Sequence, residues 1–244
     1  MNRKELKSKA KEQLKENNNY WKMTFIVFIY LVIVGFGNWL SDRTGGATRQ
    51  LINLIYTIVL AYPLSISVVY VAYKVARNKE CSIKNLGYFT KIYGKAVGIK
   101  VLLMVFISIG FILFIIPGII VSLRLSQAEF ILVDDNSKGI IQCLKESNQM
   151  MKGHCWEYFV LTLSFILWYI VGVITICIGF IFIMSYINTT LANYYLNKLL
   201  NNYFLQFQHL KISLKIINSK GIFLFLYYLF SYYIHLLNMT SKPT

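Results

Sequence analysis

Charged residues are missing from this chain in long blocks. No Asp, Glu, Lys or Arg occurs from 101 to 123 or from 158 to 196, and further uncharged apolar runs cover 23–40 and 51–73. An apolar run of about 18 residues or more is long enough to cross the hydrocarbon core of a bilayer as a helix. The pattern predicts an all-α fold, a polytopic transmembrane helix bundle with amphipathic helices at its surface.

The apolar runs divide into about six spans. A third span is expected from 98 to 116, and the strong turn signal Pro117-Gly118 separates it from a fourth span over 119–133. As one helix, 158–196 would be about 58 Å long against a hydrocarbon core of about 30 Å, so we expect two spans there. The turn between them is bracketed by Gly172 and Gly179.

The fourth span is the weakest of the six. Its fifteen residues reach only about 22 Å as a helix, and they include Arg124 and Glu129. Tilted neighbours, local thinning of the bilayer or a partly re-entrant path would reconcile this length with a membrane. The rival interpretation is one long helix over 98–123, with 124–157 outside the membrane.

Residues 2–19 are expected to form a helix outside the membrane. Leu6, Ala10 and Leu14 recur every four residues and make a narrow apolar stripe among basic residues. Such a helix can rest on an anionic leaflet, at about 1 kcal/mol for each basic residue near the surface, or it can serve only to set the topology. The expected lipid contacts are Arg3, Lys4, Lys7, Lys11 and Lys15.

Residues 137–152 are predicted to form a second surface helix. Asp134 and Asp135 precede it, Lys152 lies in its last turn and Gly153 follows. Acidic residues at the start, a basic residue at the end and a glycine after the last turn are what helix termini favour.

The composition agrees with a membrane protein and explains the net charge. Apolar residues make up 57% of the chain and charged residues 14%, with a mean hydropathy of +0.54 and a net charge of +15. The Lys and Arg residues lie in short stretches between the apolar runs and form no nucleic-acid motif, so we expect no nucleic-acid partner. Only Arg43 and Arg49 fall in the outer loops of a six-span arrangement, which places the N-terminus in the cytoplasm.

Three regions follow from these patterns. Residues 1–22 are expected to form the basic cytoplasmic helix, 23–200 the transmembrane bundle, and 201–244 a basic linker with an aromatic, apolar tail. The apolar run 221–237 is at the low edge of spanning length. It is a seventh span, an interfacial helix or an aberrant extension.

A few polar side chains fall within the predicted spans. Arg124 and Glu129 are the only charges that lie inside a span, and an ionisable residue there is a functional-site hypothesis by default. The simpler interpretation is that Arg124 reaches the interface and Glu129 bonds to a neighbouring helix. Asn188 and Asn193 give the last span a polar side that suits interhelical hydrogen bonds better than a substrate path.

No motif in the chain indicates an enzyme. A glycine-rich phosphate loop, paired carboxylates, a Gly-x-Ser-x-Gly elbow and metal-spaced histidines are all absent from the sequence. The four cysteines form no Cys-x-x-Cys pair. We therefore expect no catalytic residue, no cofactor and no metal.

Several sequence motifs carry a resemblance to a known family. They are the basic start Arg3-Lys4-Glu5-Leu6-Lys7, the Pro117-Gly118-Ile119 break, the surface helix with Ser147, Met151, Lys152 and Gly153, and Thr189-Thr190 with Tyr194-Tyr195. Residues 1 to 200 resemble a family of bacterial integral membrane proteins known as domain of unknown function 975, which is distantly similar to the membrane domain of some glycerophosphodiester phosphodiesterases. The resemblance implies a bacterial plasma membrane and no known activity.

Two functions from different classes remain. The first is a non-enzymatic envelope protein that binds membrane lipids or an unknown protein partner through its basic surface helices. The alternative is a small-solute transporter or permease component with a site between Pro63, Pro117-Gly118, Arg124 and Glu129. Charge reversal at Lys7, Lys11 and Lys15 is expected to harm the first function most, and a change at Glu129 the second.

Overall fold

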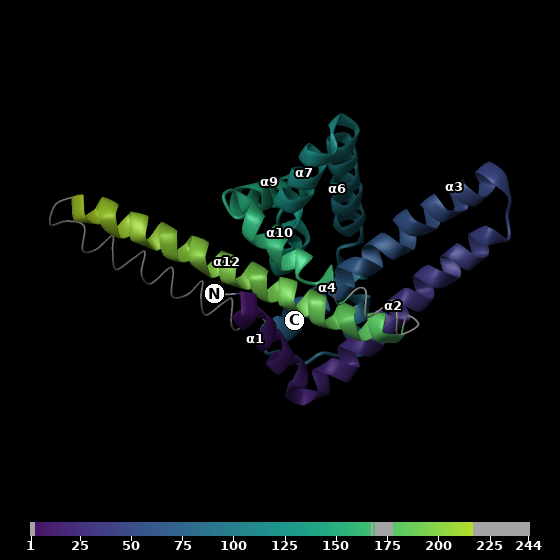
Figure 1. Cartoon of the computed structure of the whole chain (residues 1–244), viewed down its shortest axis with the longest axis horizontal. Helices are drawn as coiled ribbons and strands as arrows, with labels where there is room; N and C mark the ends of the chain where they lie inside the picture. The colour runs from purple at the N-terminus through teal and green to yellow at the C-terminus, as the bar shows by residue number, and fades with distance from the viewer. Residues whose placement is uncertain (1–2, 167, 169–177, 217–244) are drawn as a thin grey trace. The chain divides into compact units, whose positions relative to one another are not determined.

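The computed structural model describes residues 3–166, 168 and 178–216, and these residues are almost entirely helical, with no strand (Figure 1). The all-α prediction is confirmed. Among the described residues, four helical segments are long and apolar enough to cross a membrane, and the expected count of about six spans stays a prediction. The four segments are Asn19–Asp42, Gly46–Ala76, Tyr93–Leu113 and Ile115–Asp134.

The N-terminal helix α1, Arg3–Lys15, leads through a 3-10 turn, Glu16–Asn18, into α2, Asn19–Asp42. Asn18 has a φ of 56°, a left-handed conformation that asparagine tolerates, so the chain changes direction there. The apolar stripe of α1 is buried, with Leu6, Ala10 and Leu14 at most 2% exposed. The stripe is therefore covered by the protein itself, and only the basic faces of α1 can reach lipid.

The second segment pairs with α2 in an antiparallel hairpin (Figure 1). It consists of α3, Gly46–Tyr56, a π-helical turn, Thr57–Ala61, and α4, Tyr62–Ala76. The π-turn ends at Ala61, two residues before Pro63. Because Pro63 lies in the first turn of α4, its missing amide costs no regular helical hydrogen bond.

A second hairpin follows a loop that contains the short helices Ile83–Gly87 and α5, Tyr88–Lys91. It pairs α6, Tyr93–Leu113, with α7, Ile115–Leu125, which continues after a turn into α8, Ala128–Asp134.

The break between α6 and α7 lies at Phe114, three residues before the predicted Pro117-Gly118 break, so that position was wrong. Phe114 is extended, with φ −166° and ψ 159°. Pro117 falls in the first turn of α7, where proline is tolerated because the amide there has no helical partner. Gly118 instead allows α7 to pack closely on α6, since a Cβ atom on it would lie 2.6 Å from the Phe111 ring.

The predicted second surface helix is α9, Ile140–Met151, which packs on α7 and α8. It is followed by α10, Cys155–Leu163, and then by α12, Ile178–Ile216. The chain divides into two compact units, Met1–Asn197 and Lys198–Thr244. The predicted turn near Gly172 and the apolar run 221–237 lie outside the described residues.

Candidate functional site

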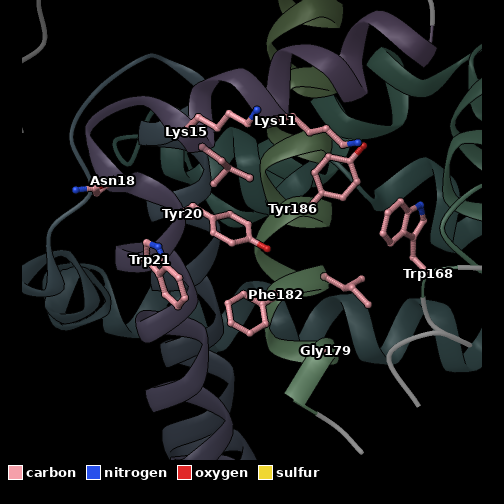
Figure 2. Close-up of a pocket in the computed structure, with 11 residues that line it drawn as sticks. Lys11, Lys15, Asn18, Tyr20, Trp21, Trp168, Gly179, Phe182 and Tyr186 are labelled. Carbon is pink, nitrogen blue, oxygen red and sulfur yellow. The ribbon is translucent and has the colours of Figure 1, made fainter. Parts of the chain in front are cut away.

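A pocket of about 560 Å³ lies between α1, the start of α2 and the start of α12 (Figure 2). Its size falls in the range of small-molecule sites, about 300–1,000 Å³. All of its lining residues belong to the first unit. They are Lys11, Leu14, Lys15, Asn18, Tyr20, Trp21, Trp168, Gly179, Phe182, Ile183 and Tyr186.

Aromatic rings form most of the pocket walls. The rings of Tyr20 and Phe182 stack with centroids 5.7 Å apart, and Trp21 meets Phe182 edge-on at 5.7 Å. Trp168 and Tyr186 make a further edge contact at 6.0 Å. Such walls suit an apolar or amphiphilic ligand.

Two lysines stand on one side of the pocket. Figure 2 shows Lys11 and Lys15 projecting from α1 on the side opposite Phe182. The Lys11 ammonium lies 5.8 Å from the centroid of the Tyr186 ring and 6.0 Å from that of Trp168. In the described part of the chain, neither lysine forms an ion pair with a carboxylate.

A third basic side chain, Lys7, lies one turn before Lys11 on α1. Its ammonium sits 4.4 Å from the centroid of the Phe165 ring and donates to the Ser164 carbonyl at 3.4 Å. Burial lowers the pKa of Lys7, and the positive charges of Arg3 and Lys11 lower it further. An anion bound at this face of α1 would relieve that repulsion.

An apolar groove adjoins the pocket. It has a volume of about 530 Å³ and shares Trp21 and Phe182 with the pocket. Phe25 and Phe28 of α2 line it and are about half exposed, and Lys22 stands at its edge. The pocket therefore carries Lys11 and Lys15, and the groove beside it is lined mainly by apolar side chains, with Lys22 among them.

Buried hydrogen bonds hold the helices that form the pocket. The Gln13 amide donates to the Ala76 carbonyl at 2.9 Å and to the Asn78 side chain at 2.8 Å. Asn193 donates to the Gln13 side-chain oxygen at 2.7 Å, and Thr24 lies 3.5 Å from Ser185. Gln13 thus ties α1 to α4 and α12, a role that its position among lysines did not suggest.

The charged residues predicted within the spans have different partners. Glu129 accepts from the Lys100 ammonium at 2.6 Å, and both side chains are 19% exposed. Arg124 lies 3.5 Å from the Asn148 side-chain oxygen on α9. Glu129 therefore bonds to a neighbouring helix, as the simpler interpretation had it.

The two predicted asparagines of α12 also make separate contacts. Asn188 donates to the Met184 carbonyl one turn earlier, whereas Asn193 reaches Gln13. Among the described residues, these hydrogen bonds do not join the two asparagines to Arg124 or Glu129. No shared polar site emerges from these four residues.

The residues of the family-like surface helix have structural roles. Ser147 is buried, donates to the Arg124 carbonyl at 2.8 Å and accepts the Gln127 amide at 3.1 Å, so it fixes the turn between α7 and α8. Met151 is buried and Lys152 exposed. Gly153 has a φ of 82°, a conformation that favours glycine.

The expected lipid contacts divide into two groups. Lys11 and Lys15 line the pocket and Lys7 lies close by, whereas Arg3 and Lys4 are exposed at the start of α1 and do not line it. The sequence reasoning missed the aromatic partners, because Trp168 and Phe182 are far from α1 along the chain.

A second polar cluster, around Asp134, was also missed. Its carboxylate accepts from Arg77 at 3.1 Å, from the Tyr195 hydroxyl at 3.0 Å and from the Tyr73 hydroxyl. From the sequence, Asp134 is predicted only as an acidic residue that precedes the second surface helix. A signal was present, since an acidic residue beside a long apolar segment needs a partner.

The described residues hold no group of three His, Cys, Asp or Glu side chains that could bind a metal ion. Cys81, Cys143 and Cys155 are free thiols.

These features define an all-α protein with several helices suited to a membrane and an aromatic pocket with basic residues on one side. Residues 89–202 match a family model described as "Protein of unknown function (DUF975)", which is the family that the sequence motifs resemble. The matched region contains the α6–α7 hairpin, α9 and residues 178–202 of α12, but neither α1 nor α2. No curated protein and no solved structure matches the chain.

Proposed function

We propose that this protein is a multi-pass membrane protein without enzymatic activity that binds an anionic lipid in the pocket between α1, α2 and α12. One observation supports the proposal most: Lys11 and Lys15, without carboxylate partners among the described residues, stand over a pocket with aromatic walls. A lipid with a negatively charged headgroup matches both features, since the headgroup can pair with the lysines and the acyl chain can lie against the aromatic walls.

The energetics favour a lipid over a soluble anion. Each basic residue near an anionic headgroup contributes about 1 kcal/mol, so two lysines alone give weak binding. An acyl chain drawn from the leaflet already lies in hydrocarbon, so the groove adds packing contact rather than hydrophobic free energy, whereas a soluble anion has no chain to cover the aromatic walls. The neighbouring apolar groove between Trp21, Phe28 and Ile181 offers a place for such a chain.

The location follows from the same features. Tyr20 and Trp21 lie at the start of the first long apolar helix, where aromatic rings prefer the membrane interface. The basic α1 precedes it, and the positive-inside rule puts such a segment in the cytoplasm. We therefore propose that the N-terminus lies inside and that the lipid comes from the cytoplasmic leaflet, and the family resemblance of the sequence motifs supports a bacterial plasma membrane.

Native mass spectrometry of the full chain, extracted gently from its membrane, tests the proposal. The parent protein is expected to retain phosphatidylglycerol in preference to phosphatidylcholine. The double variant Lys11→Gln/Lys15→Gln is expected to retain at least fivefold less. The control variant Lys4→Gln/Lys9→Gln removes the same charge from exposed positions of α1 that do not line the pocket, and it should bind as the parent does.

Three outcomes contradict the proposal. An equal loss of retained lipid in both double variants would mean that lipid binding depends only on the net charge of the protein. Undiminished retention in the pocket variant would mean that the lipid binds elsewhere. Competition by inorganic phosphate as effective as that by phosphatidylglycerol would point to a soluble anion and would also overturn it.

A further inference from the structure

The helical hairpins α2–α3 and α6–α7 end differently. The α2–α3 hairpin turns through Asp42, Arg43, Thr44 and Gly45, and Asp42 pairs with Arg49 at 2.5 Å. The Arg43 guanidinium lies 4.3 Å from the centroid of the Trp39 ring. Charged groups beside a tryptophan are typical of a turn that emerges at a membrane surface.

The α6–α7 hairpin ends in apolar side chains instead. Its tip residues are among the most exposed large apolar side chains of the described structure, and Phe114 at the turn is 76% exposed. No charged residue lies between Lys100 and Arg124. The exposed fractions of the tip are 83% for Ile112, 63% for Leu113, 70% for Ile115 and 71% for Ile116.

The charges that flank this hairpin limit how deep it reaches. At 1.5 Å per residue, Phe114 lies about 21 Å along α6 from Lys100 and about 15 Å along α7 from Arg124. A hydrocarbon core is about 30 Å thick. By the same measure, the Lys22-to-Asp42 stretch of α2 covers about 30 Å. The α2–α3 hairpin has the length to cross the membrane, and the uncharged part of α6–α7 reaches about half to two thirds of the way.

The position of helix α9 also limits how deep the α6–α7 hairpin can reach into the membrane. It carries exposed polar side chains, among them Gln142 and Lys145, which need water or headgroups. It packs on α7, and Leu144 and Lys145 share a cleft with Val121 and with Phe106 of α6. Polar surroundings therefore extend along the hairpin to these residues, and only the part beyond them is left for hydrocarbon.

The turn suits a low-dielectric setting. Phe114 is the one non-helical residue between α6 and α7, and both of its backbone groups are bonded. Its amide donates to the Gly110 carbonyl, and its carbonyl accepts the Gly118 amide, each at 3.2 Å. Pro117 has no amide to satisfy. The first-turn amides of Ile115 and Ile116 and the last-turn carbonyls of α6 after Gly110 remain as the cost of the turn, and the apolar tip offsets it.

We infer that the α6–α7 hairpin is re-entrant: it enters the bilayer from the side of Lys100 and Arg124, holds Phe114 among the acyl chains and returns to the same side. The surface it offers is the tip, and its partner is the acyl-chain interior of the membrane. This inference is independent of the lipid pocket, which involves other helices.

Thiol labelling of intact membranes tests the inference. The four native cysteines are replaced in the full chain, and Phe114→Cys is compared with the matched tip variant Thr44→Cys. A membrane-impermeant maleimide is expected to label Thr44→Cys from one side at least tenfold faster than Phe114→Cys from either side. Both should label fully after denaturation in SDS.

Labelling of Phe114→Cys from either side at a rate like that of Thr44→Cys would overturn the inference, since the tip would then reach water. Oxidative cross-linking of two copies through Phe114→Cys would overturn it as well, since a second chain would cover the tip. If the cysteine-free chain does not fold, Phe114→Trp in the parent chain gives a second measurement. Lipids brominated in the middle of the acyl chain should quench it more than Thr44→Trp, and equal quenching would overturn the inference.

Discussion

Asp134 shows how a single residue connects distant parts of the chain. Its carboxylate accepts hydrogen bonds from Tyr73 of α4, from Arg77 just after α4, and from Tyr195 of α12. The side chains of Asp134 and Arg77 are 13% and 14% exposed, so the pair is largely removed from water. A charge in such a place is tolerated only when it is paired and hydrogen-bonded.

Replacing Asp134 is expected to destabilise the fold strongly. Asp134→Ala removes the carboxylate from the Arg77 guanidinium and from two tyrosine hydroxyls, at a cost of about 3–5 kcal/mol. Asp42→Ala is the matched control, because its ion pair with Arg49 is more than half exposed and is worth at most about 1 kcal/mol. Thermal unfolding in detergent measures both, and similar midpoints would contradict the prediction.

The described cysteines are expected to differ in reactivity. Cys81 is 2% exposed and burial raises its pKa to about 11, while Cys143 is fully buried with a pKa raised by the same cause. A raised pKa leaves less thiolate at neutral pH, and the thiolate is the reactive form. Cys155, which is partly exposed, should therefore react first with a maleimide at pH 7.5 in folded protein.

Single-cysteine variants followed by mass spectrometry check this order. Faster labelling of Cys81 than of Cys155 would refute it. The same variants address topology, because strong labelling of Cys143 or Cys155 from outside intact cells would contradict both the six-span arrangement and the re-entrant α6–α7 hairpin, each of which leaves these residues on the cytoplasmic side.

Among the elements, the α6–α7 hairpin owes its close packing to glycine. A Cβ atom on Gly110 would lie 2.9 Å from the Gly118 Cα and 3.3 Å from its amide nitrogen. Small residues at such crossings let helices approach closely in membranes, where packing rather than hydrophobic burial drives association. A glycine also allows a close contact in the α2–α3 hairpin, where Gly37 faces the Tyr56 ring.

Gly110→Val is expected to weaken the α6–α7 hairpin by about 1–3 kcal/mol, because the backbone it would meet cannot move aside. Gly35→Val on α2 is the control, since a Cβ atom there has no neighbour within 4 Å. Thermal unfolding in the same detergent should separate the two variants. A loss at Gly35 as large as that at Gly110 would show that glycine replacement itself, and not the crossing, causes the effect.

For the molecule as a whole, the pocket should couple lipid binding to stability. It is formed by α1, α2 and α12, which come together only in the folded chain. A ligand that binds the folded state alone stabilises it by about 2.7 kcal/mol at one hundred times its dissociation constant.

Added phosphatidylglycerol is therefore expected to raise the melting temperature of the full chain in detergent by several degrees, and phosphatidylcholine should do less. Lys11→Gln/Lys15→Gln should melt at nearly the parent temperature without lipid and lose most of the shift. A shift that survives in this variant, or an equal shift with both lipids, would argue against an anionic site in the pocket.

The sequence by itself determined the helical class and the positions of the long apolar helices, because an uncharged run must form its backbone hydrogen bonds within itself in a bilayer. It also located the stripe of Leu6, Ala10 and Leu14 and the glycine after α9. These features depend on local composition and on helical periodicity, which are readable along the chain.

Only the tertiary structure decided what these helices meet. It covered the α1 stripe with protein, moved the break from Pro117 to Phe114, and gave Glu129 the partner Lys100 and Asp134 the partner Arg77. It also brought Phe182 beneath Lys11 and Lys15. Such pairings join residues tens to more than a hundred positions apart, and side-chain complementarity across helices leaves no periodic trace in one sequence.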